Sequence, residues 1–409
     1  MIYQLKKLQT ELVKPIRTAA GTLKRTLSSL PDKQLRKPQV SSALGLLDIF
    51  ARVTREIKKP AFNITKTIIE SQEYAVAEEI ALARPFGNLL HFKVQGMKKR
   101  RPKVLIMAPI SGHFATLLRD TVKRMLADHD VYITDWISAN MVPLNLGTFG
   151  LDEYNSYIIS FLQKMGPGAH VMAVCQPVVQ GLAVCAIMSE ANDPCTPASV
   201  ILMGGPVDPR KNPTMVNRFA ESFSIEWFKN NLIQIVPAGF PGVGRRVYPG
   251  FIQIMAFISM NPHKHFDAHT QYLIDCIEKN DKGQIKHREF YDEYLTPMDM
   301  DADFFIETVD KVFKKYEFAR GTMKYKGKLI DPKKITKTAL LTVEGERDDI
   351  SALGQTYAAH DLCSNIPKKN KRSFVQPGVG HYGVFSGSKW RGIIAPVITE
   401  FICKHDKSC

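Results

Sequence analysis

The chain has 409 residues, of which 44% are hydrophobic and 23% charged, and a formal net charge of +15. This composition is that of a globular protein, and no stretch approaches the roughly 20 uninterrupted apolar residues of a membrane-spanning helix. The N-terminus lacks the apolar run of a signal peptide. The seven cysteines have neither the spacing of a disulfide framework nor a C-x-x-C zinc pattern, so we expect a cytoplasmic protein.

Positive charge is concentrated in the first 60 residues, which hold 13 Lys or Arg against four acidic residues. A solvated basic extension and a surface for an anionic partner, such as a phospholipid-coated particle, both explain this bias. Without a helix-turn-helix, RNA-recognition or zinc-finger signature, we do not expect a nucleic-acid partner. Residues 1–70 are predicted as a mainly helical extension, broken by Pro15, Pro31, Pro38 and Pro60.

The next elements follow in a regular order. Weak strands are expected near 75–77 and 89–92, and short continuous apolar runs at 104–109, 131–136, 170–174 and 200–203 predict buried parallel strands. Helical patterns fall between them, at 115–127, after Asp152 as a capping residue, and after Cys175. Further strands are expected at 339–343 and 373–375, with helices from Ser351 and over 388–403. This order predicts an α/β fold with a doubly wound, mostly parallel sheet, built from residues 71–206 and 331–409.

Between 207 and 330 the alternation lapses, and we predict a cap inserted between sheet strands. This stretch is rich in aromatic residues and methionine, which could be simple core or could line a hydrophobic cleft that grips an apolar chain. The side chains concerned are Met215, Phe219, Phe223, Trp227, Phe228, Met255, Phe257, Met260, Phe304 and Phe305.

The most informative segment surrounds Cys175, where an apolar strand stops and a helical pattern starts at once. Such a turn holds a side chain out on a tight elbow and aims the following backbone N–H groups at one point. A thiol there lies at the positive end of a helix, which favours the attacking thiolate. The alternative is a packed core cysteine. Elbows of this kind have small residues two before and two after the nucleophile; here Ala173 fits and Pro177 departs.

Two more residues follow predicted strands. Asp348 comes after the strand at 339–343, and His381 lies in Gly380-His381-Tyr382-Gly383 after the last strand. The order nucleophile, acid, histidine is that of the α/β-hydrolase fold, and the carboxyl ends of parallel strands share one edge of a sheet. Asp349 competes with Asp348 as the acid; we prefer Asp348, which leaves Asp349 to cap the helix from Ser351.

An oxyanion site needs backbone donors. We expect the N–H of Gln176 together with that of Ile110 or Ser111, in the loop after the first core strand. His113 in the same loop could polarise a substrate or be a surface residue. His265 and His269 would share a helix face, but no further ligand is evident, so we predict no metal site.

These motifs together resemble the intracellular polyhydroxybutyrate depolymerases. The likeness rests on Ala173–Pro177, Val131–Trp136, Thr342–Ile350, Gly380–Gly383 and the N-terminal Met1–Gln4. The resemblance implies hydrolysis of storage polyester at the surface of cytoplasmic granules, with release of 3-hydroxybutyrate oligomers or monomer. It also implies a cysteine nucleophile, with Cys175, Asp348 and His381 as the triad, no cofactor, and water or coenzyme A as acyl acceptor.

Alternatives remain open. A polyester synthase would run acyl transfer in the building direction, but synthases usually have glycine two before and two after the cysteine, where this chain has Ala173 and Pro177. A non-catalytic granule protein would show a broken triad. A generic lipase or thioesterase differs mainly in the shape of its cap.

Overall fold

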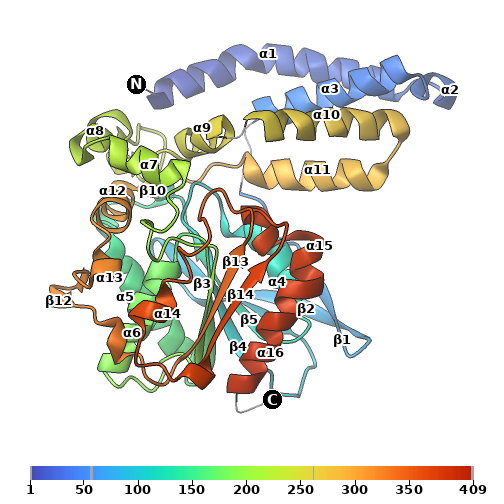
Figure 1. The fold of residues 1–409 in the computed structure, drawn as a ribbon. Coiled ribbons are helices and arrows are strands. Elements are labelled where there is room, and N and C mark those ends of the chain that lie inside the picture. Colours follow the sequence, from blue (N-terminus) through green and yellow to red (C-terminus); the bar gives the residue numbers. More distant parts are fainter. Residues whose placement is uncertain (1, 56–58, 261, 407–409) are drawn as a thin grey trace.

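The computed structural model describes residues 2–55, 59–260 and 262–406. At its centre is a nine-stranded sheet with the strand order β1-β2-β3-β5-β4-β6-β7-β13-β14 (Figure 1). Pairing is antiparallel from β1 to β5 and parallel from β5 to β14. The strands are β1 (Lys66–Ile69), β2 (Gln72–Leu82), β3 (Gly87–Val94), β4 (Lys103–Met107), β5 (Asp130–Trp136), β6 (Ala169–Val174), β7 (Ser199–Met203), β13 (Ala339–Gly345) and β14 (Lys371–Gln376).

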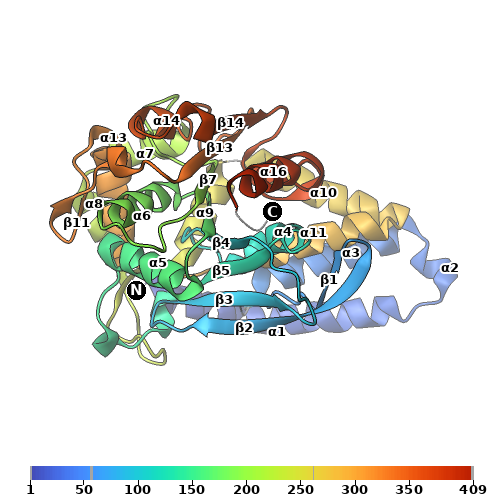
Figure 2. The same ribbon diagram turned by 90° about the horizontal axis from the view of Figure 1, so that it is seen from below.

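Helices cover both faces of this sheet, which is why its central strands are buried throughout and mainly apolar. Every residue of β6, β7 and β13 is buried. In Figure 2, α5 (Leu151–Met165) and α6 (Val178–Glu190) lie on one side of the sheet, and α4 (Arg119–Met125) and α16 (Ala395–His405) lie on the other. The predicted doubly wound α/β-hydrolase fold is confirmed.

Local details differ from the expectations in three places. Helix α5 is capped by Gly150, whose N–H donates to Glu153 Oε2 at 2.9 Å, whereas Asp152 accepts from the Lys326 N–H. Pro15 does not break the first helix: it lies on the exposed side, where water can satisfy the carbonyl that loses its partner.

The third difference lies after Ser351, where the structure has turns in place of the predicted helix. The buried carboxylate of Glu344 accepts the backbone N–H groups of Gly354, Thr356 and Tyr357 at 2.9, 2.9 and 3.1 Å. These donors therefore do not enter a helical ladder, and only the short α14 (Ala359–Leu362) follows.

The stretch predicted as a cap is mainly helical and covers the carboxyl edge of the sheet. Its helices are α7 (Met215–Ser222), α8 (Ile225–Asn231), α9 (Gly250–Met260), α10 (Pro262–Glu278), α11 (Asp281–Tyr294), α12 (Ala302–Glu307) and α13 (Glu317–Arg320). Its strands are β8 (Gln234–Ile235), β9 (Arg246–Tyr248), β10 (Met300–Asp301), β11 (Lys324–Tyr325) and β12 (Lys328–Leu329).

The N-terminal helices α1 (Ile2–Ser28), α2 (Asp32–Leu35) and α3 (Pro38–Thr54) lie against this cap, and Figure 1 shows α1, α3, α10 and α11 stacked above the sheet. The sheet itself starts at β1, inside the range predicted as helical extension. Among the described residues, none of the helices combines the length and the apolar character needed to cross a bilayer.

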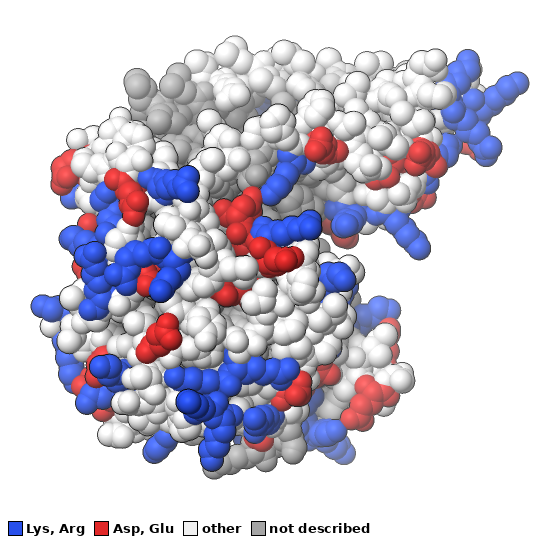
Figure 3. Space-filling view, viewed as in Figure 1, with Lys and Arg blue, Asp and Glu red and all other residues white. Residues whose placement is uncertain are grey.

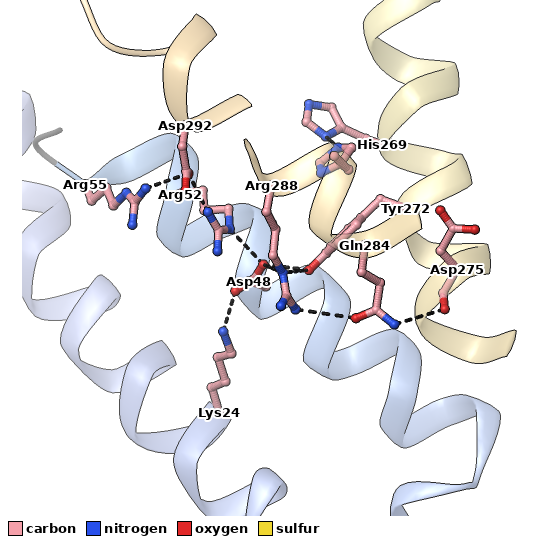
Figure 4. Close-up of polar contacts among 11 residues, drawn as sticks. Lys24, Asp48, Arg52, Arg55, His269, Tyr272, Asp275, Gln284, Arg288 and Asp292 are labelled. Carbon is pink, nitrogen blue, oxygen red and sulfur yellow. Dashed lines mark hydrogen bonds and ion pairs between the residues drawn. The ribbon is translucent and has the colours of Figure 1, made fainter. Parts of the chain in front are cut away.

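A buried carboxylate joins the N-terminal helices to the cap (Figure 4). Asp48 of α3 is 4% exposed and accepts hydrogen bonds from Lys24 of α1, from Arg52 Nε at 2.8 Å, from the Tyr272 hydroxyl at 2.6 Å and from Arg288 Nε at 3.2 Å. Tyr272 and Arg288 belong to α10 and α11. Part of the basic charge of the N-terminal region is therefore used inside the protein, around one acidic side chain.

Candidate active site

Cys175 lies on a sharp turn between β6 and α6. Its φ of +66° is a left-handed conformation that non-glycine residues rarely adopt. Its N–H donates to the Met203 carbonyl oxygen at 2.8 Å, which ties the turn to the end of β7. A Cβ at Gly205 would come within 2.2 Å of the Cys175 carbonyl oxygen, so glycine is required beside this turn. The backbone therefore has the elbow form predicted from the sequence, with a partly exposed thiol.

His381 and Asp348 lie side by side beyond the ends of β14 and β13. His381 Nδ1 donates to Asp348 Oδ2 at 2.8 Å, both residues are buried, and Cys175 lies close enough to act on the charge of the imidazole. Burial alone would lower the pKa of His381, but the charges of Asp348 and Cys175 and its hydrogen bond to Asp348 raise it well above its usual value. The imidazole is thus a strong proton acceptor next to a thiol.

The two neighbouring aspartates have different surroundings. The second oxygen of Asp348, Oδ1, accepts the backbone N–H groups of Ile350 and Ser351 at 2.9 and 2.8 Å, which fixes the carboxylate in place. Asp349 does not cap a helix as expected, because no helix begins at Ser351. Its Oδ2 instead forms an ion pair with Lys264 of α10 at 2.7 Å.

The candidate oxyanion donors are near the elbow but are not equivalent. Neither the Gln176 N–H nor the Ser111 N–H has a hydrogen-bond acceptor within the part of the chain that the structure describes. The Ile110 N–H, by contrast, donates to Gln176 Oε1 at 3.4 Å. One of the three predicted oxyanion donors, the Ile110 N–H, is therefore already hydrogen-bonded to an amide oxygen of the protein.

His113 is neither a surface residue nor an open group in the site. It is 2% exposed, and its Nε2 hydrogen-bonds to the carbonyl oxygen of Tyr294 in the cap at 3.1 Å. Burial lowers the pKa of His113 to about 4, so the ring is neutral near pH 7. In this position His113 links the loop that carries Ile110 and Ser111 to the end of α11.

A cavity of about 310 Å³ lies between the loop that carries His381 and the cap. Two of the cap side chains singled out in the sequence, Phe257 and Met260, line it. Others pack on one another, as Phe223 does on Trp227 with ring centroids 4.1 Å apart, so both interpretations of these residues apply. The lining comprises Phe257, Met260, Lys264, His265, Ala268, Phe290, Tyr291, Tyr294, Asp349, Ile350, Gly380, His381, Tyr382 and Gly383.

The cap histidines take part in hydrogen bonds with one another and with tyrosines. His269 Nδ1 lies 3.1 Å from His287 Nε2, and His265 Nδ1 lies 2.9 Å from the Tyr291 hydroxyl. Within the described residues, no group of three or more His, Cys, Asp or Glu could hold a metal ion. Cys403 is disulfide-bonded, which the cysteine spacing did not predict.

Comparison of the chain with known protein families identifies the hydrolases that it is related to. Residues 204–406, about half of the chain, match the family described as "PHB de-polymerase C-terminus". The chain is a PHB depolymerase-like α/β-hydrolase. The matched range contains Asp348, His381 and the whole cap, and it supports ester hydrolysis as the activity of this PHB depolymerase-like protein.

Solved structures similar to this PHB depolymerase-like hydrolase share little sequence with it, and no curated protein matches it. A putative lipase from Acinetobacter baumannii is 13% identical, with a TM-score of 0.45, over 81% of this chain and 92% of its own. An esterase from Thermogutta terrifontis is 11% identical, with a TM-score of 0.42, over 81% and 99%. A thioesterase domain from the curacin biosynthetic pathway is 10% identical, with a TM-score of 0.42, over 80% of this chain and 99% of its own.

The sequence interpretation missed two groups in this PHB depolymerase-like protein. The Gln176 side chain, which bonds Ile110, was considered only for its backbone. Tyr294 and Tyr382, whose ring centroids lie 6.1 Å apart, line the cavity beside His381. Tyr382 could have been noticed as the neighbour of His381, whereas nothing in the sequence pairs it with a residue 88 positions away.

Proposed function

We propose that the protein hydrolyses the ester bonds of intracellular polyhydroxybutyrate through Cys175, His381 and Asp348. The observation that carries the proposal is the hydrogen-bonded pair of His381 and Asp348 beside the elbow thiol of Cys175, in a chain that matches the PHB depolymerase family. The elbow conformation of Cys175 supports its role as the nucleophile. Water is the proposed acyl acceptor, with coenzyme A as the alternative.

The proposed first step forms a thioester. His381 takes the proton of Cys175, and the thiolate attacks the ester carbonyl carbon. The negative charge moves to the carbonyl oxygen, which accepts hydrogen bonds from the Gln176 and Ser111 N–H groups, each worth a few kcal/mol in the transition state. The carbon–oxygen bond then breaks, and His381 gives its proton to the leaving hydroxyl.

The second step releases the acid. His381 removes a proton from water, the resulting hydroxide attacks the thioester, and the Cys175 sulfur leaves and regains a proton from His381. Asp348 holds Nδ1 protonated throughout, so the other ring nitrogen is the one that exchanges protons. With coenzyme A as acceptor the same base would activate a thiol, and the product would be a new thioester.

Product analysis with native amorphous granules tests this proposal. Wild-type protein should release 3-hydroxybutyrate or its oligomers, and Cys175→Ala should release none while keeping its fold and its sedimentation with granules. Near-full activity of Cys175→Ala would contradict the mechanism. Adding coenzyme A separates the acceptors, since only thiolysis gives 3-hydroxybutyryl-coenzyme A. Polymer formation from that thioester would instead indicate a synthase.

We also propose that helix α1 contacts the granule surface. Leu8, Leu12, Ile16 and Leu23 share one helix face and are 56%, 64%, 59% and 51% exposed. An exposed apolar stripe of this kind on a basic amphipathic helix is typical of helices that lie on an apolar–water interface. In Figure 3 the described part of the upper edge of the molecule carries few charges, and basic side chains gather at its right end. Exposed Lys33 lies in α2, and exposed Arg36 and Lys37 follow it directly.

Charge substitutions on the two sides of α1 test this contact. Leu12→Glu with Ile16→Glu should abolish sedimentation with granules and leave hydrolysis of a small dissolved ester intact. The matched control, Thr18→Glu with Thr22→Glu, adds the same charge to another exposed side of the same helix. Equal loss of sedimentation in both double variants, or in neither, would contradict a role for the apolar face.

A further inference from the structure

The cavity beside His381 lies on one side of the position where the ester bond would be cleaved. His381 lines it, whereas Cys175 and the three oxyanion donors do not. In an acyl transfer, the atom that His381 protonates is the leaving oxygen, while the acyl carbon stays at the sulfur. A cavity reached past His381 therefore adjoins the alcohol part of the ester and not its acyl part.

The walls of the cavity are apolar, with one line of neutral polar groups across them. The rings of Tyr382 and Tyr294 lie with their centroids 6.1 Å apart. The Tyr294 hydroxyl lies 3.4 Å from His265 Nε2, and His265 Nδ1 lies 2.9 Å from the Tyr291 hydroxyl. Burial, and then the charge of Lys264, lower the pKa of His265, so this ring is neutral near pH 7. At the cavity rim, Lys264 is paired with Asp349.

This chemistry fits a neutral ester chain better than an anion. Polyester units carry hydrogen-bond acceptors only, namely carbonyl and ester oxygens, between apolar carbons. Tyrosine hydroxyls in an apolar wall supply rotatable donors for such acceptors. Both cationic groups of the lining are already paired with a carboxylate, Lys264 with Asp349 and His381 with Asp348, so neither offers an unpaired positive charge to a free carboxylate or a phosphate. Its volume of about 310 Å³ is in the range of small-molecule sites.

We propose that this cavity binds the hydroxyacyl units on the alcohol side of the scissile bond, and that the Tyr294 and Tyr382 hydroxyls donate to their ester carbonyls. The assignment rests on the proposed function and adds a substrate-binding site to it. Tyr294 and Tyr382 are then specificity-determining residues, since they contact the leaving segment and not the reacting carbon. Esters with a longer leaving segment should be better substrates than esters with a short one.

Two substrates with different leaving groups test the site. Methyl 3-hydroxybutyrate releases methanol and leaves the cavity empty, whereas the linear 3-hydroxybutyrate trimer fills it. Ala268→Phe, which puts a ring into the cavity from α10, should lower kcat/KM for the trimer at least about tenfold and change that for the methyl ester little. Thr270→Phe, an exposed position on the same helix, is the matched control and should change neither value.

The tyrosine hydroxyls are tested separately from the volume of the cavity. Tyr294→Phe and Tyr382→Phe keep the rings and should each raise KM for the trimer by roughly threefold to tenfold, the effect of one lost hydrogen bond. Parallel losses for both substrates in Ala268→Phe, or no loss for either, would overturn the assignment.

A binding measurement separates failure of this site from failure of the proposed function. In the Cys175→Ala background the trimer should raise the Tm, and Ala268→Phe should remove that rise. If wild-type protein cleaves neither ester but the trimer still raises the Tm in an Ala268-dependent way, the site stands and the proposed hydrolysis fails. If cleavage occurs and the trimer gives no Ala268-dependent rise, the site is wrong.

Discussion

Asp348 Oδ2 accepts the hydrogen bond of His381 Nδ1 at 2.8 Å, while its other oxygen is held by two backbone N–H groups. The carboxylate therefore cannot rotate away from the imidazole without losing two further hydrogen bonds. This arrangement fixes both the orientation of the ring and the nitrogen that carries the proton. Substitution of Asp348 should therefore have a much larger effect than substitution of its neighbour Asp349.

Asp348→Asn should lower kcat by a factor of about 10³ to 10⁴, because an amide no longer stabilises the protonated ring or fixes its tautomer. The pKa of His381 should fall, since the carboxylate charge that raises it is gone. Steady-state kinetics and an NMR titration of His381 measure the two effects. Asp349→Asn, which breaks an exposed ion pair, should have only a small effect on either; the reverse ranking would assign the acid to Asp349.

Gly205→Ala should destabilise the protein strongly or prevent its folding. The added Cβ would lie 2.2 Å from the Cys175 carbonyl oxygen and 2.5 Å from Val178 Cγ2, so the elbow would have to move, at a cost of about 3 kcal/mol or more. Thermal unfolding measures the change. Gly21→Ala, in helix α1 with no heavy atom within 4 Å of the new Cβ, is the control and should be neutral or stabilising by up to about 1 kcal/mol.

Asp48→Ala should loosen the N-terminal helices from the cap. It removes the carboxylate that accepts from Arg52 and the Tyr272 hydroxyl, while Arg52 keeps its ion pair with Asp292, so we expect a cost of about 1–3 kcal/mol. Hydrogen exchange should rise in α1, α3, α10 and α11 and stay unchanged in the central strands. A uniform rise across the whole protein would mean that these helices do not open as a separate unit.

The pH dependence of stability follows from the same carboxylate. Burial would raise the pKa of Asp48, but its hydrogen bonds to Lys24, Tyr272 and Arg52 outweigh burial and hold the pKa well below its usual value. A depressed pKa contributes stability that is present above the unfolded pKa near 4 and is lost as pH falls below it. Urea unfolding between pH 6 and pH 3 should show this loss in the wild type and a smaller one in Asp48→Ala.

Buried histidines add a second acid-sensitive contribution at higher pH. Burial lowers the pKa of His113 and of His129 to about 4, from an unfolded value near 6.5. The unfolded chain therefore binds more protons between pH 6.5 and pH 4, and the free energy of unfolding should fall across this window. Unfolding curves at pH 7.5, 6 and 5 measure the decline, and His129→Gln should reduce its slope. A free energy of unfolding that is independent of pH in this window would contradict the assignment.

The sequence predicted best those features that are determined by residues close together in the chain. Continuous apolar runs located the buried strands, and the strand-to-helix junction at Cys175 located the elbow, because both depend on neighbouring residues. It failed where a distant side chain overrides the local pattern. Glu344 takes the N–H groups that a helix after Ser351 would have used, and Gln176 reaches the N–H of Ile110.

Asp48 shows the same limit for electrostatics. In the sequence it is one acidic residue within a basic segment, and a solvated extension was a reasonable interpretation. Its burial depends on Tyr272 and Arg288, more than 220 positions away, so no local pattern could place it inside a helical interface. The sequence therefore gives the net charge of the first 60 residues, but only the structure shows which of their charged side chains are buried and which are exposed.

The Asp48 contacts also define which parts of the chain could be exchanged with another hydrolase. Helices α10 and α11 carry cavity-lining residues, and their outer surface is completed by α1 and α3 rather than by the sheet domain. A chimera that received residues 250–295 alone would present Arg288 without its carboxylate and the Tyr272 hydroxyl with no acceptor where α3 should lie. Transplanting the selectivity of this protein would therefore require moving its first 55 residues together with those helices, as a two-segment graft.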